Sequence, residues 1–421
     1  MGRPLALPGL FFVLLATAVI TACGGSGSSS VSGGNNSVGI GVGFNGGATA
    51  TPTAGASASS TPTPTGKSPT PTPTTGGTSS LCFSSSPPTP GPVSPTAAPI
   101  RLGTYNINPS KVFVAGISSG GFFAVQMHVA HSSVFKGAAI YAGGVYYCDQ
   151  GNLALALAEC GGETNINCQA LYSSTLAQSE AYLDAQSLAG TIDNERNLQG
   201  QPVYLWSGTN DEVVNPSEMI DLQSEYVHYG ALVTFDNAFP ANHGWESPDG
   251  TVPCGTATDP YMIACYQNGV AYDSERTWLS LFFGSLNPRN NGAAIGSLLN
   301  FDQTEFGASA SNGMDTNGYV YVPPTCAAQV RCGLVLAFHG CRQIQTAIGT
   351  TFIKDAGINE WADTNNFVVL YPYVILSTVN PTDPQGCWDW WGYDDSNYAL
   401  KSGTQLSIIY KMVQRVDPSA P

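Results

Sequence analysis

The feature that most constrains the fold is a Gly-x-Ser-x-Gly sequence between an expected strand and an expected helix. Residues 112–115 form an apolar run typical of a buried strand, residues 116–121 read Gly-Ile-Ser-Ser-Gly-Gly, and a helical pattern follows. This is the context of a nucleophile elbow, in which glycines permit a sharp turn that exposes the serine hydroxyl at the helix N-terminus. We predict that Ser118 is a nucleophile; the alternative is an ordinary strand–helix turn with a capping serine.

Short apolar runs alternate with longer helical patterns after residue 98, and this alternation indicates an α/β fold. The expected strands are residues 112–115, 138–142, 203–206, 231–235, 333–338 and 367–371, and the expected helices are residues 121–131, 217–229, 350–364 and 405–416. Together with the elbow, the pattern predicts an α/β-hydrolase fold in a single catalytic domain, residues 99–421.

Two segments precede this domain. Residues 1–22 combine Arg3 with an apolar stretch too short to span a bilayer, which predicts a signal peptide. The segment ends in Ile-Thr-Ala-Cys, similar to the lipobox of bacterial lipoproteins, so we favour cleavage before Cys23 with lipid on its sulfur; simple secretion is the alternative. Residues 23–98 are rich in Gly, Ser, Thr and Pro and nearly uncharged, which predicts a disordered tether.

Charge and cysteine content narrow the classes of function. The chain has 14 Lys plus Arg against 29 Asp plus Glu, and no basic run, so we expect no nucleic-acid partner. Eleven cysteines suit an oxidising compartment, so we expect a secreted or cell-surface protein. We also expect the protein to be a monomer. Neither the histidines nor the cysteines have the spacing of metal ligands, so we expect no metal and no cofactor.

A serine nucleophile needs a histidine base, and elimination among five histidines favours His243. It lies in a loop, residues 240–245, that follows the strand expected at residues 231–235. The other four lie on the helix that leaves the elbow, in a second helical run, or at the end of a strand: His128, His131, His228 and His339. On the first of these helices, a rise of about 1.5 Å per residue carries His128 about 15 Å from the elbow.

The acid that orients the base should lie between Ser118 and His243 in the chain order of α/β-hydrolases. Asp211 fits, because it follows the end of the strand expected at residues 203–206, and its neighbour Glu212 is the competitor. Three other aspartates lie in polar or helical stretches and are expected to be solvated: Asp184, Asp193 and Asp221.

Several pieces of the chain together resemble the poly(3-hydroxybutyrate) depolymerases and the related feruloyl and acetylxylan esterases. They are the elbow with residues 141–144, the His-Gly-Cys loop at residues 339–341, the strand at residues 367–372, and Gly-Cys-Trp-Asp-Trp-Trp at residues 386–391. In most relatives the C-terminal pieces come first. The resemblance therefore implies a circularly permuted α/β-hydrolase fold, as in extracellular depolymerases of short-chain polyhydroxyalkanoates, with strands 334–338 and 112–115 in one sheet.

The resemblance implies a serine esterase that hydrolyses poly(3-hydroxybutyrate) or related polyesters through an acyl-enzyme and releases 3-hydroxybutyrate monomers and oligomers. The oxyanion hole would consist of the backbone N–H groups of Ser119 and Cys341. Three tryptophans would bind the polyester, although a small core around a disulfide is an equal alternative for the last two: Trp388, Trp390 and Trp391. Other readings are a carbohydrate-linked (feruloyl or acetylxylan) esterase and a non-catalytic adhesion lipoprotein.

The resemblance also implies a disulfide between Cys341 and Cys387, which follow two of the family motifs. Spacing alone does not determine how the remaining cysteines pair. We take Cys160–Cys168 and Cys254–Cys265 as guesses.

Overall fold

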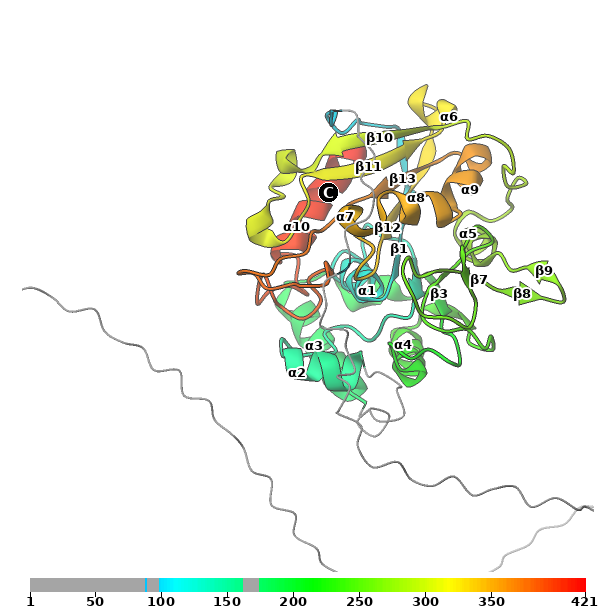
Figure 1. Ribbon diagram of the computed structural model, residues 1–421. Helices are drawn as coiled ribbons and strands as arrows, with labels where there is room; N and C mark the ends of the chain where they lie inside the picture. The colour runs from blue at the N-terminus through cyan, green and yellow to red at the C-terminus, as the bar shows by residue number, and fades with distance from the viewer. Residues whose placement is uncertain (1–87, 89–97, 162–173) are drawn as a thin grey trace, which may run out of the picture. The chain divides into compact units, whose positions relative to one another are not determined.

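The structure is a computed structural model that describes residue 88 and residues 98–161 and 174–421 (Figure 1). The predicted signal peptide, the lipidation site Cys23 and almost the whole of the predicted tether lie outside the described residues. Within the described ranges, no helix is both long and apolar enough to cross a membrane.

In the described part of the chain, the main sheet has eight strands in the order β10-β11-β13-β12-β1-β2-β3-β4. Their bounds in that order are Ser297–Asp302, Asn317–Val322, Phe367–Tyr371, Cys332–Phe338, Ile107–Ile117, Ala138–Tyr141, Pro202–Trp206 and Leu232–Asp236. The strands from β13 to β4 are parallel to one another, whereas β11 runs antiparallel to both of its neighbours, β10 and β13. The six expected strands are confirmed. All but β4, which lies at the edge of the sheet and is partly exposed, are apolar runs as burial on both faces requires.

The two halves of the chain meet in the middle of the sheet. Val112 of β1 pairs with Leu334 of β12, and the register continues in parallel, so the prediction that these strands share a sheet is confirmed. The first described residues of the domain also lie beside its C-terminal helix, because the Tyr105 N–H donates to the Val416 carbonyl oxygen at 2.9 Å. Residues 109–112 and 417–421 contribute to one small surface hollow. This arrangement agrees with circular permutation, which stays a prediction.

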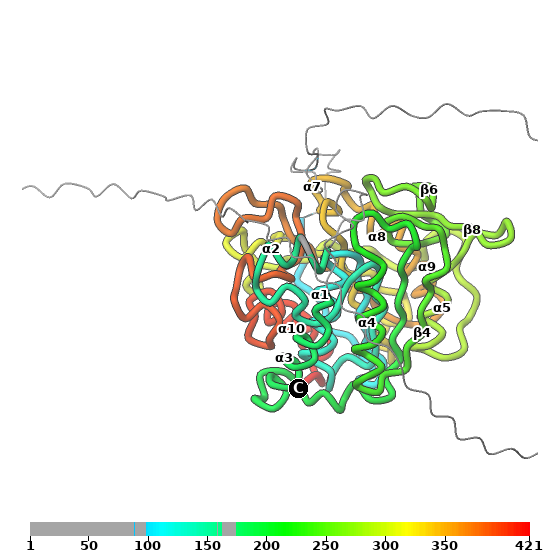
Figure 2. Tube along the Cα trace, turned by 90° about the horizontal axis from the view of Figure 1, so that it is seen from below, coloured from blue at the N-terminus to red at the C-terminus, as the bar shows by residue number. Residues whose placement is uncertain are grey.

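Helices cover both faces of the sheet (Figures 1 and 2). One core contains Val112 and Val114 of β1 together with side chains of α1 (Ser119–Ala130), α3 (Leu176–Ala189), α4 (Pro216–His228) and α10 (Thr404–Val416). The other contains Phe113 and Ala115 with side chains of α5 (Ser274–Phe283), α8 (Thr351–Asp355) and α9 (Ile358–Asn365). Successive residues of β1 thus point to opposite faces, as the pleat of a strand requires.

Shorter elements complete the fold. They are the helical turns α2 (Leu153–Leu155), α6 (Pro324–Ala327) and α7 (Gln345–Ile348), and the short strands β5 (Trp245–Glu246), β6 (Val252–Pro253), β7 (Met262–Ala264), β8 (Tyr266–Gln267) and β9 (Val270–Ala271). The single helix expected over residues 350–364 is wrong. It is split into α8 and α9, because Gly357 adopts φ 70°, a left-handed conformation that interrupts a helix.

The described residues contain four disulfides: Cys148–Cys160, Cys254–Cys265, Cys326–Cys332 and Cys341–Cys387. The guess Cys254–Cys265 is therefore confirmed, and the guess Cys160–Cys168 is wrong. The turn formed by α2 and residues 156–160 brings Cys160 back toward Cys148, with 5.9 Å between their Cα atoms, which is within the span of a disulfide. Cys168 lies outside the described residues.

Candidate active site

Ser118 occupies a tight turn between β1 and α1. Its backbone has φ 56° and ψ −127°, a conformation that non-glycine residues rarely adopt, and its N–H donates to the Tyr141 carbonyl oxygen at 2.9 Å. A Cβ at Gly116 would overlap the backbone of Gly120, and a Cβ at Gly120 would overlap the carbonyl oxygen of His339. The Ser118 side chain makes no capping hydrogen bond, which argues against the alternative of an ordinary capped turn.

His243 and Asp211 form a buried pair. His243 Nδ1 lies 2.9 Å from Asp211 Oδ2, and only 5% and 1% of the two side chains are exposed. The other carboxylate oxygen, Oδ1, accepts the backbone N–H groups of Val213 and Val214 at 2.8 and 2.9 Å, so the orientation of the carboxylate is fixed. Glu212 is exposed, and the structure therefore pairs Asp211 rather than its competitor with the histidine.

An asparagine that the sequence reasoning missed holds the loop of His243. Asn242 Oδ1 accepts the N–H of His243 at 2.8 Å and the N–H of Glu212 at 3.1 Å, and so joins the loops that follow β3 and β4. These loops also touch through their backbones, because a Cβ at Gly208 would overlap the carbonyl of Ala241. An asparagine directly before a loop histidine was the available signal.

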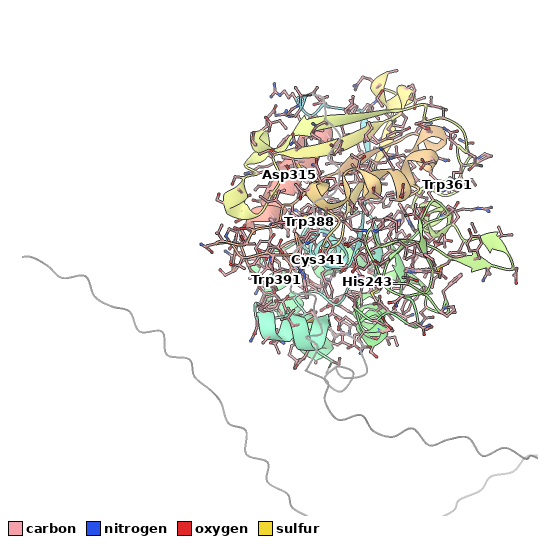
Figure 3. The ribbon with its side chains drawn as sticks, in the orientation of Figure 1. His243, Asp315, Cys341, Trp361, Trp388 and Trp391 are labelled. Carbon is pink, nitrogen blue, oxygen red and sulfur yellow. A yellow bond between two sulfur atoms is a disulfide. The ribbon has the colours of Figure 1, made fainter. Side chains whose placement is uncertain are left out.

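Ser118 and His243 line one cavity of about 140 Å³ (Figure 3 labels His243 and Cys341). Its walls are mostly apolar, and the lining residues that carry the argument are Ile117, Phe122, Val213, Val214, Trp390 and Arg342. Cavities of this kind, apolar with a few convergent polar groups, are the usual place of an active site.

Ser119 and Cys341, the two residues predicted to form an oxyanion hole, also line this cavity. Ser119 is the first residue of α1, where a helix leaves its N–H groups without an intrahelical partner. Within the part of the chain that the structure covers, neither backbone N–H donates a hydrogen bond. The backbones are close, since a Cβ at Gly340 would lie 3.2 Å from the Ser118 Cβ.

The three tryptophans predicted to bind substrate have different environments. Trp390 lines the cavity and stacks on Phe122, with 4.2 Å between the ring centroids. Trp391 is half-buried and packs edge to face against Trp390 at 5.5 Å. Trp388 lies in the core with no exposed surface, and its indole N–H donates to the His339 carbonyl oxygen at 3.0 Å. Direct contact with substrate is therefore open to Trp390, whereas Trp388 supports the neighbouring loop.

Two of the other histidines, His128 and His339, are buried and do not line the cavity, and the expectation for Asp193 needs a correction. His128 is buried and bonds to Tyr226 and Gln201, and burial lowers its pKa to about 4. Burial likewise lowers the pKa of His339 to about 4. Asp193, expected to be solvated, instead forms an ion pair with Lys401 that closes a long-range contact not visible in the sequence.

The disulfide between Cys341 and Cys387 joins the oxyanion loop (residues 339–343) to the tryptophan loop (residues 385–391). We expect the double variant Cys341→Ser/Cys387→Ser to lose about 4 kcal/mol of unfolding free energy, because the bond closes a long loop in the unfolded chain. We also expect its kcat to fall about tenfold as the Cys341 N–H loses its fixed position. Urea unfolding and ester hydrolysis measure the two effects.

The matched control is Cys326→Ser/Cys332→Ser. It removes a disulfide that lies away from the cavity and joins residues only 6 positions apart. It should destabilise the protein less and leave kcat unchanged. Equal kcat values for the two double variants would contradict the positioning effect.

Two carboxyl groups are buried behind the loop of His243. Glu246 accepts the N–H of Ser274 at 3.2 Å, and Glu275 accepts the indole N–H of Trp245 at 2.8 Å. Each has a second oxygen that is buried without a partner among the described residues. Burial raises the pKa of Glu246 to about 8, and burial with the charge of Asp273 raises the pKa of Glu275 well above its usual range.

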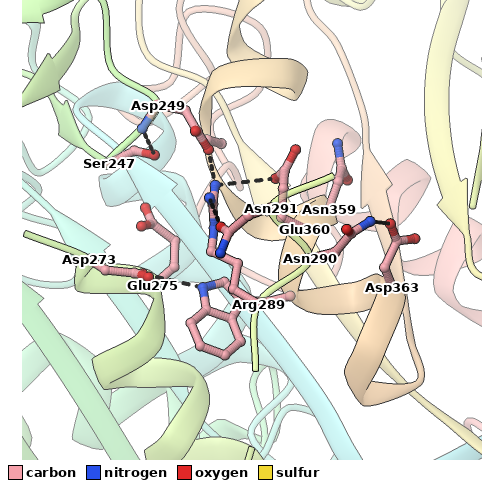
Figure 4. Close-up of polar contacts among 12 residues, drawn as sticks. Ser247, Asp249, Asp273, Glu275, Arg289, Asn290, Asn291, Asn359, Glu360 and Asp363 are labelled. Carbon is pink, nitrogen blue, oxygen red and sulfur yellow. Dashed lines mark hydrogen bonds and ion pairs between the residues drawn. The ribbon is translucent and has the colours of Figure 1, made fainter. Parts of the chain in front are cut away.

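Charged groups surround this pair. Arg289 forms ion pairs with Asp249 and Glu360, and Asp273 accepts the indole N–H of Trp361 (Figure 4). The negative charge of Asp273 adds to the effect of burial and raises the pKa of both Glu246 and Glu275. Both carboxyls are thus expected to be protonated at neutral pH.

We expect stability to fall as pH rises from about 5 to about 8. Over this range the folded protein retains the Glu246 proton, whereas an exposed glutamate in the unfolded chain, with a pKa of about 4.3, has lost it. Unfolding then releases a proton, so one such group lowers the unfolding free energy by about 1.4 kcal/mol per pH unit. Glu246→Gln should make the profile measured by urea unfolding less steep, although other buried carboxyls with a raised pKa, such as Glu225, keep part of the slope. Asp184→Asn, at an exposed carboxyl, should leave the slope unchanged. An unchanged slope in Glu246→Gln would show that the group ionises normally.

A mostly parallel sheet whose central strand ends in a strand–serine–helix elbow places the chain among the α/β-hydrolase-like esterases. Two family models agree: one described as "Putative esterase" matches residues 98–247, and one described as "Esterase PHB depolymerase" matches residues 317–417. The chain is 35% identical over 339 residues to a polyhydroxybutyrate depolymerase of Talaromyces funiculosus, covering 75% of this chain and 92% of the relative. It belongs to the poly(3-hydroxybutyrate) depolymerase family.

Further relatives are consistent with this membership. A poly(3-hydroxybutyrate) depolymerase of Delftia acidovorans is 38% identical over 317 residues, which cover 74% of this chain and 60% of the length of that relative. The crystal structure of the PHB depolymerase from Penicillium funiculosum matches with a TM-score of 0.68 at 33% identity, covering 75% of this chain and 98% of the other. The same values hold for a PHB depolymerase complexed with an R3HB trimer.

Proposed function

We propose that this protein hydrolyses the ester bonds of poly(3-hydroxybutyrate) or related short-chain polyhydroxyalkanoates through an acyl-enzyme on Ser118. One observation carries the proposal. Ser118 and His243 line the same mostly apolar cavity, and His243 forms a buried pair with Asp211. The names of the relatives, all depolymerases of this polymer, supply the substrate class.

The mechanism begins with a proton transfer. Asp211 engages Nδ1 of His243, which leaves Nε2 to accept the proton of the Ser118 hydroxyl. The serine oxygen bonds to the ester carbonyl carbon, and the N–H groups of Ser119 and Cys341 donate to the resulting oxyanion. The ester C–O bond then breaks, and His243 returns the proton to the departing alcohol end of the polymer. Water, deprotonated by His243, then attacks the acyl carbon. The bond between this carbon and the Ser118 oxygen breaks, the acid is released, and His243 returns the proton to Ser118.

The walls of the cavity suit a neutral polyester. Such a chain carries methyl groups and carbonyl oxygens but no charge, so apolar contacts and a few donors are sufficient to bind it. Phe122 and Trp390 supply a stacked apolar wall, and Val213 and Val214 supply another. Arg342 lines this cavity, and Asp259 balances its charge.

The test uses the full chain with a turbid suspension of poly(3-hydroxybutyrate), and the released 3-hydroxybutyrate is quantified. We expect the wild type to clear the suspension and Ser118→Ala to leave it turbid. If the wild type cleaves a soluble butyrate ester but not the polymer, the polymer assignment is wrong, and release of ferulate or acetate from xylan would indicate a carbohydrate-linked esterase. Polymer binding without any ester hydrolysis would support the adhesion reading.

We also propose that the protein is exported and works as a monomer outside the cytoplasm, anchored through lipid on Cys23. The disulfides support the oxidising compartment. The anchor is tested by expressing the full chain and its Cys23→Ser variant in a bacterial host. We expect the wild type in the membrane fraction and the variant in the soluble fraction; the same distribution for both would contradict lipidation.

A further inference from the structure

Arg342 lies where three loops around the cavity meet. It lines the cavity directly after Cys341, and its backbone has φ 67°, a left-handed conformation that is costly for a residue with a side chain. Its N–H donates to the Gln385 carbonyl oxygen at 2.7 Å, and its Nη1 donates to Gln385 Oε1 at 3.1 Å. Arg342 thereby joins the oxyanion loop to the tryptophan loop.

The other edge of the guanidinium is held by Asp259. Arg342 Nε lies 2.9 Å from Oδ1 and Nη2 lies 2.7 Å from Oδ2, which is the two-bond geometry of a forked arginine–carboxylate pair. Most exposed ion pairs contribute little, but bidentate pairs with fixed geometry are the exception. This pair connects residues 83 positions apart in the chain.

Asp259 belongs to a short turn, residues 258–262, that reaches the catalytic histidine. The ring of Tyr261 packs edge to face against His243, with 5.9 Å between centroids, and the Tyr261 carbonyl oxygen accepts the N–H of Trp245 at 2.8 Å. The Pro260 carbonyl oxygen accepts Nε2 of Gln343, a member of the oxyanion loop, at 2.7 Å. A movement of this turn would thus displace both the base and the oxyanion loop.

We propose that Arg342 is a positioning residue whose forked pair with Asp259 fixes the oxyanion loop relative to His243 and to the tryptophan loop. The inference rests on the proposed function, because it assigns the Cys341 N–H to the oxyanion hole. It accounts for an arginine in a strained conformation on the wall of an otherwise apolar cavity. The guanidinium is engaged by Asp259 and Gln385, which argues against a direct role in gripping the carboxylate end of a polymer chain.

Arg342→Met and Asp259→Asn test the proposal with two neutral soluble substrates, p-nitrophenyl acetate and p-nitrophenyl butyrate. We expect kcat to fall about tenfold in each variant on both substrates, with KM within about twofold. The loss is smaller than the 10²–10³-fold loss typical of removing a donor, because the disulfide and Gln343 still hold the loop. The double variant should be no worse than either single variant, since each breaks the same contact. Arg342→Lys, which keeps the charge but not the fork, should not restore kcat.

Arg415→Met is the matched control. Arg415 pairs with Glu305 at 3.0 Å, and the exposed fractions of 26% and 28% resemble the 21% and 39% of Arg342 and Asp259, but the pair does not line the cavity. Its kcat should stay at the wild-type value. Hydrogen exchange of residues 339–343 gives a readout independent of turnover: it should speed up in Arg342→Met and in Asp259→Asn but not in the control.

Three results would overturn the proposal. The first is a kcat for Arg342→Met and Asp259→Asn equal to that of Arg415→Met. The second is unchanged exchange of residues 339–343 in both variants. The third is a loss confined to anionic substrates, such as the free acid of a 3-hydroxybutyrate dimer, which would mean that Arg342 binds substrate. A wild type that hydrolyses no ester would instead refute the proposed function, and the exchange measurement would still decide whether the pair holds the loop.

Discussion

Replacing Ser118 by alanine should lower kcat for a soluble butyrate ester about 10⁶-fold, because the proposed acyl-enzyme forms on the Ser118 hydroxyl. The residual rate would come from binding and from the oxyanion donors alone. The effect is chemical rather than structural, since the Ser118 side chain makes no capping bond and alanine keeps the Cβ. Thermal unfolding should therefore be close to that of the wild type. The measurement is ester hydrolysis over a long time course with enzyme in excess.

Ser118→Gly is the control for strain at this position. Glycine adopts φ 56° without a steric penalty, so this variant should be equally inactive and at least as stable as Ser118→Ala. Retention of more than about one thousandth of the activity by both variants would point to a different nucleophile, because loss of a nucleophile costs far more than that.

Asp211→Asn should lower kcat about 10⁴-fold, the second largest effect we expect. An asparagine at this position can still accept the N–H groups of Val213 and Val214 through its oxygen. Its NH₂ group would then face Nδ1 of His243, which favours the tautomer that carries the proton on Nε2 and so blocks base catalysis. KM for the soluble ester should change little, because Asp211 does not line the cavity.

Glu212→Gln is the control for the orienting acid. Glu212 follows Asp211 in the sequence but is exposed. The kcat of Glu212→Gln should therefore stay within about twofold of the wild-type value, as expected for a surface substitution. Similar losses in Asp211→Asn and Glu212→Gln would mean that charge in this loop, rather than the specific carboxylate on His243, supports activity.

The sequence was sufficient for the parallel strands and the elbow, because both depend on local patterns. A strand buried on both faces is a continuous apolar run, and Gly116 is required by a backbone contact with Gly120, only four residues away. The antiparallel strands β10 and β11 were missed. Ser297–Asp302 mixes polar and apolar residues and is half exposed, so its pattern resembles that of a loop.

The supporting residues of the site were beyond the reach of sequence reasoning for a different reason. Asn242, Gln343 and Arg342 act through side-chain bonds to groups that lie 30 to 83 positions away, and no local pattern reveals such partners. Trp388 is the opposite case, because its motif is visible in the sequence but the direction of its side chain is not. It stands in a motif full of aromatic side chains, but whether such a side chain faces a cavity or the core depends on the strands packed behind it.

The place of the C-terminus has a practical consequence for attaching this protein to a surface. Pro109 and the C-terminal residues share a hollow at the start of β1, whereas Ser118 lies at its far end. At about 3.3 Å per strand residue, the two places are about 30 Å apart. A support or fusion partner joined to the C-terminus would therefore be attached at the end of β1 opposite the cavity, and the cavity would stay accessible to a solid polymer.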